Sequence, residues 1–599
     1  MKSSPNVYLS SSSLISAVGF GLDETVDALL HYRSGVHIQQ NDAVSDIAIP
    51  VGLIDRARLK EQVEAMSSSS ETGGMDIHAC SLLEQLCILT IRDVLQQSGT
   101  DLSAPDCGLI ISTTKGNVDS LRGEKILHED SPAFLWQTSG RLAAYFNMSR
   151  KPLLVSNACI SGVSALIVAR RLILAGNYRH VVVVGADILS HFITSGFLSF
   201  KSVSRNRCVP YDSRHDGLNL GEACGALLVS REHKSDRDIV LAGGAVTNDA
   251  HHISAPSRTG DGLALAISEA MAEAGATAGD ISFVNAHGTS TVYNDEMEAK
   301  AVFLAGLQDV PVNSTKPYFG HTLGASGVVD TILCLEELRR NVLFGTLGFE
   351  SRGVEAPIKV YADNRTFPMK SCVKTASGFG GCNAAVVLCR QDYVSQLSQK
   401  AATDTETSLF TTLRRVEIID GKVLADGTEI FKSDSPVFSD FVRAAYLQTG
   451  EKNIKFSKKD DLAKLGYLTS LYLLEGCRYD GTKTGIVLAN ASASLHADLL
   501  HEQVIEAEGD KGARPSVFVY TLPNVTAGEI CIRHGIKGEN TFFIYKDYNE
   551  QVMTELEHYA SLVVSEKKLS VCIVGWCELL SDTSYHAVFK LICKTDNHG

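Results

Sequence analysis

Short apolar runs alternate with segments of helical periodicity through the first 390 residues of the chain. The apolar runs predict buried strands at residues 14–20, 107–112, 181–185, 225–229, 283–285 and 384–388. Between them, apolar side chains recur at intervals of three and four residues, which predicts helices at residues 81–98, 162–175, 263–274, 295–304 and 328–339. Strands and helices in alternation predict an α/β fold built of layers.

A polar stretch at residues 391–408 interrupts this alternation and predicts a linker. We therefore expect one domain at residues 1–390 and a second at 409–599. The second domain repeats patterns of the first in the same order, since residues 484–489, 527–531 and 573–577 resemble 107–112, 139–143 and 183–187. The three offsets are 377, 388 and 390 positions, a drift that loop insertions produce in a duplicated unit.

The composition is that of an ordinary globular protein, with 44% hydrophobic and 21% charged residues among 599. The net charge of −14 argues against a nucleic-acid or anionic membrane surface. No uninterrupted apolar stretch reaches the roughly 18 residues of a membrane span. The 15 cysteines are scattered, with no Cys-x-x-Cys pair and no metal-like cluster of Cys and His. They predict reduced thiols in a cytoplasmic protein with no metal site.

Cys159 lies where an apolar run, residues 153–155, gives way to a helical segment that starts near residue 162. A cysteine at such a corner meets the positive end of the helix, which predicts a lowered pKa and an exposed sulfur. A single buried cysteine is otherwise most often inert packing, so this interpretation depends on what lies near it.

Two histidine loops could serve this sulfur. His287 follows a predicted strand, at the kind of strand end where ligand sites gather in open α/β sheets. His321 lies in a glycine-rich segment that allows close backbone approach. A lone histidine at the first position is more often a hydrogen-bonded structural residue, and the second histidine alone could belong to a tight glycine-rich packing turn. One nucleophile with two imidazoles and Lys316 predicts acyl transfer through a thioester.

Four motifs in this order resemble the signatures of the β-ketoacyl-ACP synthases. They are NACISG at residues 157–162, NAHGTST at 285–291, KPYFGHTLGASG at 316–327 and SGFGGCNA at 377–384. The resemblance covers roughly residues 5–390 and implies a thiolase-like fold with five layers, α-β-α-β-α. Relatives with non-decarboxylative chemistry generally carry a second cysteine where this chain has His321, so a thiolase is the weaker alternative.

The resemblance implies a Cys-His-His site. Cys159 would accept an acyl chain from acyl carrier protein, and His287 and His321 would promote decarboxylation of a malonyl thioester and stabilise the enolate oxygen. Lys316 would tune the electrostatics and hydrogen bonding of His321. One residue departs from the family: Asp330 stands nine residues after His321, where a glutamate is frequent, and this shorter carboxylate puts the supporting network in question.

The same resemblance assigns residues to the substrate. Thr289 and Thr291 would bind the phosphopantetheine arm through their hydroxyl groups, although either could instead cap a turn. The N–H groups of Cys159 and Phe379 would form the oxyanion hole, and the Phe379 ring could gate the acyl pocket. We expect no cofactor beyond the phosphopantetheine that arrives on the carrier protein. Because carrier proteins are acidic, basic side chains near the site would receive them, and the candidates are Lys201, Arg205 and Arg207.

Residues 409–599 resemble the N-terminal half of a ketosynthase, as seen in chain-length-factor-like partners. The likeness rests on LANASAS at residues 488–494 and FVYTLPNVTAG at 518–528. The position that matches Cys159 falls near Asp547, where no cysteine stands, and only 24 residues follow Gly575, so neither histidine loop has a counterpart. We therefore expect a catalytically silent half domain.

Taken together, the sequence predicts decarboxylative condensation of an acyl thioester with malonyl-ACP, in polyketide or aryl-polyene-type or specialised lipid assembly. The alternatives are a general fatty-acid elongation synthase and a scaffold that binds acyl-ACP without condensing it. The expected partner is acyl carrier protein bearing acyl and malonyl groups. The chain could form a homodimer, or residues 409–599 could supply an intramolecular pseudo-dimer instead.

Overall fold

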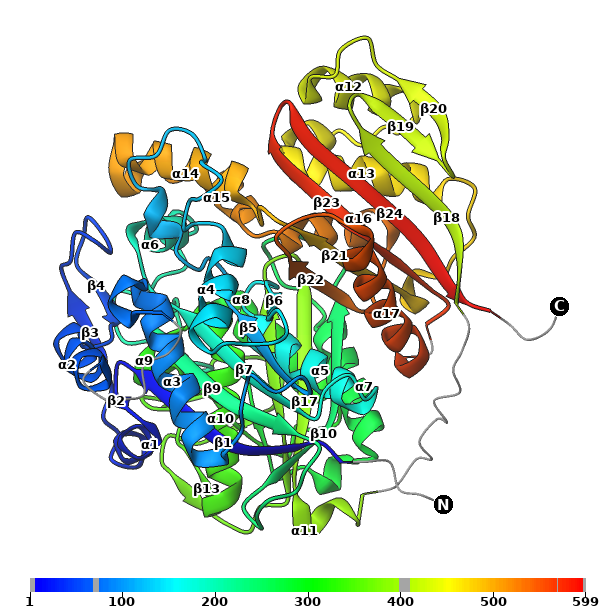
Figure 1. Ribbon diagram of the computed structural model, residues 1–599. Coiled ribbons are helices and arrows are strands. Elements are labelled where there is room, and N and C mark those ends of the chain that lie inside the picture. Colours follow the sequence, from blue (N-terminus) through cyan, green and yellow to red (C-terminus); the bar gives the residue numbers. More distant parts are fainter. Residues whose placement is uncertain (1–5, 68–74, 398–409, 568, 596–599) are drawn as a thin grey trace.

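The computed structural model describes residues 6–67, 75–397, 410–567 and 569–595. Three sheets in these residues share one strand order, in which three parallel strands are followed by two antiparallel ones (Figure 1). The first sheet runs β6 (Leu153–Val155), β5 (Cys107–Ser112), β7 (His180–Asp187), β9 (Ala223–Ser230) and β1 (Tyr8–Ser16). The second runs β12 (Pro311–Asn313), β11 (Phe283–Asn285), β16 (Ser371–Gly378), β17 (Cys382–Arg390) and β10 (Ile239–Asn248), and the short β14 (Lys359–Val360) adds a parallel strand beside β12.

Helices separate and cover the first two sheets. The pair α5 (Ser161–Leu174) and α10 (Ser326–Arg340) packs between them and contacts strands of both. The outer face of the first sheet is covered by α3 (Leu82–Ser98), and that of the second by α7 (Asp261–Ala274) and α8 (Val292–Leu304). This is the five-layered α-β-α-β-α core that the resemblance implied, so the predicted fold class is confirmed.

The third sheet belongs to the C-terminal part of the chain, drawn yellow to red in Figure 1. It runs β22 (Asn540–Ile544), β21 (Thr484–Asn490), β23 (Val571–Ser581), β24 (Ser584–Lys594) and β18 (Phe410–Ile419), and β19 (Lys422–Ala425) and β20 (Thr428–Lys432) extend it. One face carries α13 (Asp461–Leu474), with α12 (Phe438–Gln448) and α16 (Asn524–His534) packed on that helix, and the other face carries α17 (Glu550–Lys567). The C-terminal unit, as we call residues 410–595, is thus half of a thiolase-like core.

The helix α17 shows how the C-terminal unit does without a second sheet on this face. Its counterpart α5 lies between two sheets and buries 12 of its 14 residues. In α17 only 7 of 18 residues are buried, and Glu550, Thr554 and His558 lie on its exposed face. A polar outer face is what a helix needs where no second sheet covers it. The C-terminal unit is therefore adapted to the absence of a second half.

The predicted strands and helices are confirmed, with one exception in the bounds. The first strand is β1 (Tyr8–Ser16), and the short β2 (Gly19–Phe20) follows a turn, whereas the sequence predicted one strand at residues 14–20. The reason is that β1 pairs with β9 on one side and β10 on the other, so Ser12 and Ser13 are buried in a sheet despite their polarity. In the predicted linker, α11 (Gln391–Val394) is helical, and residues 398–408 lie outside the described part of the chain. The domain boundaries remain predictions.

The edge strands β6 and β22 join the first sheet to the third. They pair antiparallel, with Val155 opposite Phe543 and Leu154 opposite Ile544, and the Ser156 N–H donates to Phe542 O at 3.0 Å. The Asn157 side chain continues the junction, since its amide donates to Asn540 O at 2.7 Å and accepts from the Phe542 N–H at 3.0 Å. Because β6 leads directly into Cys159, the C-terminal unit contacts the segment that carries the candidate nucleophile.

Two buried ion pairs cross the same junction. The Lys115 ammonium lies 2.7 Å from a carboxylate oxygen of Asp498, which belongs to α14 (Leu495–Glu508). Arg171 of α5 lies 2.7 Å from Glu539, just before β22. All four side chains are almost fully buried. A buried charge that loses its partner destabilises a fold strongly, so these pairs make each unit depend on the other.

In the described part of the chain, every helix falls short of a membrane span in either length or hydrophobicity.

Candidate active site

Cys159 stands on a sharp turn between β6 and α5. Ala158 adopts a φ of +48°, a left-handed conformation that costs energy for a residue with a Cβ. The Ser161 hydroxyl holds the turn, since it accepts from the Asn157 N–H at 2.7 Å and donates to Ala158 O at 2.5 Å. The turn therefore presents the cysteine side chain at the start of the helix, as the sequence predicted.

His287 follows β11 and is fixed by a buried carboxylate. Glu298 of α8 accepts hydrogen bonds from the N–H groups of His287 and Gly288, at 2.8 and 2.6 Å, and from the Tyr211 hydroxyl at 3.0 Å. Glu298 escaped the sequence analysis, although its place in the helix after the NAHGTST motif was a usable signal. The Nδ1 atom of His287 is buried without a hydrogen-bond partner in the described residues.

His321 is held from both its backbone and its ring. Its N–H donates to Asn219 O at 2.7 Å, and Gly320 before it has a φ of +82° and lies against Leu220 so closely that a Cβ would clash. The ring Nδ1 lies 3.0 Å from the Ser326 hydroxyl, and Nε2 lies 3.1 Å from Cys159 Sγ. Backbone and ring contacts together aim one imidazole nitrogen at the sulfur.

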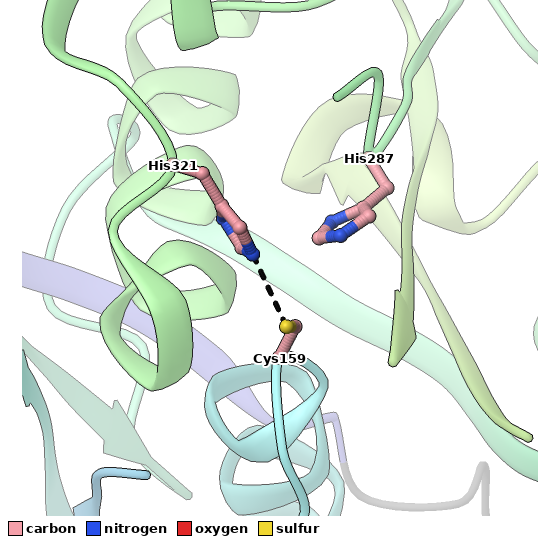
Figure 2. Close-up of side chains that lie close together, drawn as sticks. All are labelled: Cys159, His287 and His321. Carbon is pink, nitrogen blue, oxygen red and sulfur yellow. Dashed lines mark hydrogen bonds between the residues drawn. The ribbon is translucent and has the colours of Figure 1, made fainter. Parts of the chain in front are cut away.

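The three side chains converge on one point (Figure 2). The Cys159 sulfur and a ring nitrogen from each of His287 and His321 lie within 4.8 Å of one another. The two imidazole rings are 4.9 Å apart between centroids and stand at 89°. A thiol faced by two imidazoles can pass its proton to one ring while ring N–H groups bind a developing oxyanion.

The pKa of Cys159 differs from the prediction. Burial raises the pKa of this thiol to about 12, although the Lys316 ammonium acts in the opposite direction. The expected lowering by the helix N-terminus is therefore wrong for the resting site, because the cost of burying a thiolate outweighs the helix field. The resting sulfur is a neutral thiol, partly buried, and needs a base when it reacts.

Both histidines are neutral as well. Burial lowers the pKa of His287 and of His321 well below the usual value, and the ammonium groups of Lys316 and Lys374 lower it further. A neutral His321 can accept the thiol proton at Nε2 while its Nδ1–H donates to Ser326. The site is thus poised for proton transfer to His321 as the sulfur attacks.

Lys316 is paired with the carboxylate of Asp330, and its ammonium acts on both histidines. It is almost fully buried and lies 3.4 Å from Asp330, which also accepts from Lys374 at 2.9 Å and from Thr315 at 2.7 Å. Burial would raise the pKa of Asp330, but the two lysines lower it to about 2. Lys374, in the middle of β16, escaped the sequence analysis because its neighbours predict only a buried strand.

Thr289 and Thr291 lie side by side at the start of α8, with their hydroxyl oxygens 3.0 Å apart. Thr291 precedes the helix, yet its side chain makes no capping hydrogen bond. The alternative role of a turn cap is therefore not fulfilled by Thr291, and its hydroxyl remains available to a ligand.

Phe379 lies against the nucleophile turn and a cluster of aromatic rings. A Cβ on the preceding Gly378 would lie 3.1 Å from the Cys159 nitrogen, so a larger residue there would press on the nucleophile turn. The Phe379 ring is 5.3 Å from Phe200 and 6.1 Å from Phe197, and the C-terminal unit adds Phe518, 5.5 Å from Phe197. The ring cluster thus contains side chains of both units.

The three predicted docking residues are exposed. Lys201, Arg205 and Arg207 follow α6 (His191–Ser199). Their loop is tied to the site through Asn219, whose amide bonds to Asn206 O and the Cys208 N–H and whose carbonyl accepts from His321. The basic loop therefore lies close in structure to one catalytic candidate.

The neutral thiol makes a prediction about alkylation. We expect the rate at which iodoacetamide modifies Cys159, followed by peptide mass spectrometry, to rise continuously from pH 6 to pH 10. With a pKa of about 12, the thiolate is only a small fraction of the cysteine throughout this range, and that fraction grows with pH. Glutathione serves as the reference thiol and levels off earlier. A plateau for Cys159 near pH 7 would instead indicate a preformed thiolate–imidazolium pair.

Comparisons with known proteins agree with this geometry. The β-ketoacyl synthase N-terminal domain matches residues 14–235, and the β-ketoacyl synthase C-terminal domain matches residues 239–350. A 3-oxoacyl-[acyl-carrier-protein] synthase 2 from Vibrio harveyi is 29% identical over 64% of this chain and 97% of its own length.

Two solved structures extend the comparison. The ketosynthase ApeO in complex with its chain length factor ApeC, from Xenorhabdus doucetiae, shares 25% identity at a TM-score of 0.56, over 64% of this chain and 98% of its own. The PfaC ketosynthase–chain length factor covers 99% of this chain and 79% of its own, with a TM-score of 0.75 and 13% identity, so its fold resembles the whole chain, C-terminal unit included. The two matched domains span more than half of the sequence, and the chain belongs to the β-ketoacyl synthase family of acyltransferases.

Proposed function

We propose that this synthase condenses an acyl group held on Cys159 with a malonyl group delivered by acyl carrier protein. The observation that carries the proposal is the convergence of the Cys159 thiol with the rings of His287 and His321 within 4.8 Å. No cofactor takes part beyond the phosphopantetheine arm of the carrier protein, for which Thr289 and Thr291 are the proposed ligands.

The first step is acyl transfer to the enzyme. As Cys159 attacks the acyl thioester, its proton passes to His321 Nε2, 3.1 Å away, and the N–H groups of Cys159 and Phe379 receive the negative charge of the carbonyl oxygen. The sulfur–carbon bond to the carrier protein then breaks. Its thiolate leaves with the proton held by His321, so the imidazole returns to the neutral form.

The second step forms the carbon–carbon bond. The malonyl thioester loses carbon dioxide, and the resulting enolate oxygen accepts hydrogen bonds from a ring N–H of His287 and from Nε2–H of His321, whose Nδ1 accepts from the Ser326 hydroxyl in this tautomer. The enolate carbon attacks the acyl group on Cys159, the bond between that carbonyl and the sulfur breaks, and the cysteine is released to be protonated again. A neutral histidine pair in a buried site suits this step, because hydrogen bonds to a developing anion are strongest where water is excluded.

We assign the C-terminal unit the part of a chain-length factor. Its support is the fold likeness of the whole chain, this unit included, to the PfaC ketosynthase–chain length factor and the contribution of Phe518 to the aromatic cluster beside Phe379. The pairing of β22 with β6 occupies an edge that a second copy could otherwise use, which favours an intramolecular pseudo-dimer. Fusion also keeps the two units in a one-to-one ratio at high effective concentration.

With this role for the C-terminal unit, we propose that the enzyme works in polyketide or aryl-polyene-type or specialised lipid assembly. General fatty-acid elongation is the alternative within the same chemistry. A scaffold without condensing activity is a weaker candidate, since Cys159 and both histidines are present and in contact distance. The exposed basic residues Lys201, Arg205 and Arg207 are the proposed contact for the acidic carrier protein.

Acyl trapping tests the enzyme against the scaffold. Incubation with acyl carrier protein bearing a labelled acyl group should add one acyl mass to Cys159, and added malonyl-ACP should discharge it as a β-ketoacyl product with release of carbon dioxide. Cys159→Ala should lose the adduct and at least about 1,000-fold of condensation, since the nucleophile is gone. Cys477→Ala, a partly buried cysteine of the C-terminal unit, is the matched control. Carrier-protein binding without any adduct in the wild type would support the scaffold.

Phe518 tests the assignment of the C-terminal unit. With malonyl-ACP and a set of primers, we expect Phe518→Ala to lengthen the carrier-bound products by about one two-carbon unit, because removing a buried ring leaves a cavity. Phe456→Ala removes a ring of the same unit that stacks on Tyr446, and should leave product length unchanged. Equal product lengths in wild type and Phe518→Ala would contradict the assignment. Wild-type products that grow only as saturated chains after reductases are added would favour general elongation.

A further inference from the structure

Lys374 is a buried lysine that has no part in the proposed chemical steps. It lies in the middle of β16, between strands β11 and β17, and its side chain is fully buried. Its ammonium makes two hydrogen bonds, to Asp330 Oδ2 at 2.9 Å and to Thr375 O at 2.8 Å. A lysine is rarely buried unless it is paired, so its partner Asp330 is the reason that it can stand there.

Asp330 is shared by two lysines. Its Oδ2 atom lies 2.9 Å from Lys374 but 3.4 Å from Lys316, and its other oxygen accepts from Thr315 at 2.7 Å. The Lys374 contact is thus the tighter of the two. An aspartate side chain is one methylene shorter than the glutamate expected nine residues after His321, and the geometry shows a carboxylate held toward β16 and barely reaching Lys316.

Ionisable groups of both signs surround the imidazoles. The ionisable groups that act on His287 or His321, or on the lysines beside them, are Lys316 of α9 (Lys316–Phe319), Lys374 of β16, Asp330 of α10, Glu298 of α8 and Cys159 before α5. Cys159 is a neutral thiol, and burial raises the pKa of Glu298. Lys316 and Lys374 share the Asp330 carboxylate, and both ammonium groups lower the pKa of the two rings.

We infer that Lys374 is a positioning residue of the condensation site, which fixes Asp330 against β16 and provides, with Lys316, the positive charge beside His287 and His321. The inference rests on the proposed function of these two histidines. Lys374 does not touch the reacting atoms in this arrangement. It acts through the carboxylate and through its field, which disfavours a second positive charge on either ring.

Removal of this ammonium should change the pH dependence. In Lys374→Met one cation near the rings is lost, so the pKa of each imidazole rises and more imidazolium forms at a given pH. Because condensation needs neutral rings, acidification should begin to lower its rate at a higher pH in Lys374→Met than in the wild type. We expect the acidic limb of condensation to move upward by about 1 pH unit, the size of effect that a nearby charge has on a titrating group, and the rate at any pH below the wild-type pKa of the rings to fall about tenfold.

Three further variants separate charge from position. Lys374→Arg keeps the positive charge and should retain the wild-type acidic limb. The double variant Asp330→Glu with Lys374→Met gives Lys316 a longer carboxylate, so we expect it to recover much of the rate at pH 8 while the acidic limb stays shifted. Lys370→Met, an exposed lysine just before the same strand, is the matched control and should behave as wild type.

The assay follows the labelled acyl group on Cys159 and the carbon dioxide released from malonyl-ACP between pH 5 and pH 9, with thermal unfolding of each variant. A wild type that neither acylates nor decarboxylates overturns the proposed function itself. A normal wild type, with a Lys374→Met profile that is unchanged, or lowered equally at every pH together with a lower Tm, overturns only the role of Lys374. A shifted limb in Lys374→Met that Lys374→Arg restores supports it.

Discussion

The antiparallel pairing of β6 with β22 is the constraint on which the rest of the molecule depends. It joins the edge of the first sheet to the edge of the third, and the Asn157 amide extends it by two more hydrogen bonds to the backbone of Asn540 and Phe542. Cys159 follows two residues later. The position of the nucleophile is therefore set partly by a unit that has no counterpart of Cys159, His287 or His321 at the matching positions.

Burial sets the electrostatic character of the site. A thiolate is costly in a dry cavity, so the pKa of Cys159 lies near 12 and both histidines stay neutral. At rest, the charges are therefore on Lys316, Lys374 and Asp330, whereas the sulfur and the two rings are neutral. Charge appears on the sulfur and the substrate oxygen only during reaction, where fixed N–H groups stabilise it more than a prior ion pair would.

The core of the site could be predicted from the sequence because Cys159, His287 and His321 each lie within a distinctive motif at the end of a predicted strand or in a glycine-rich turn. The half core of the C-terminal unit was predictable too, because its repeats keep their order. The partners of Asn157 were not, since Asn540 and Phe542 are far along the chain and act through backbone atoms. Lys374 was not predicted as part of the site, because its role depends on Asp330, which only the packing of α10 on β16 brings near. The pKa of Cys159 was mispredicted because a sequence shows the helix but not the depth of burial.

Amide hydrogen exchange of the intact protein tests the central claim, that the C-terminal unit holds the nucleophile turn in solution. The N–H groups of Ser156 and Phe542 donate across the junction, so the account predicts that peptides containing them exchange as slowly as those of β5 and β7. Rapid exchange at Ser156 and Phe542, with β5 and β7 still protected, would show that the two units do not pair there and would contradict the account.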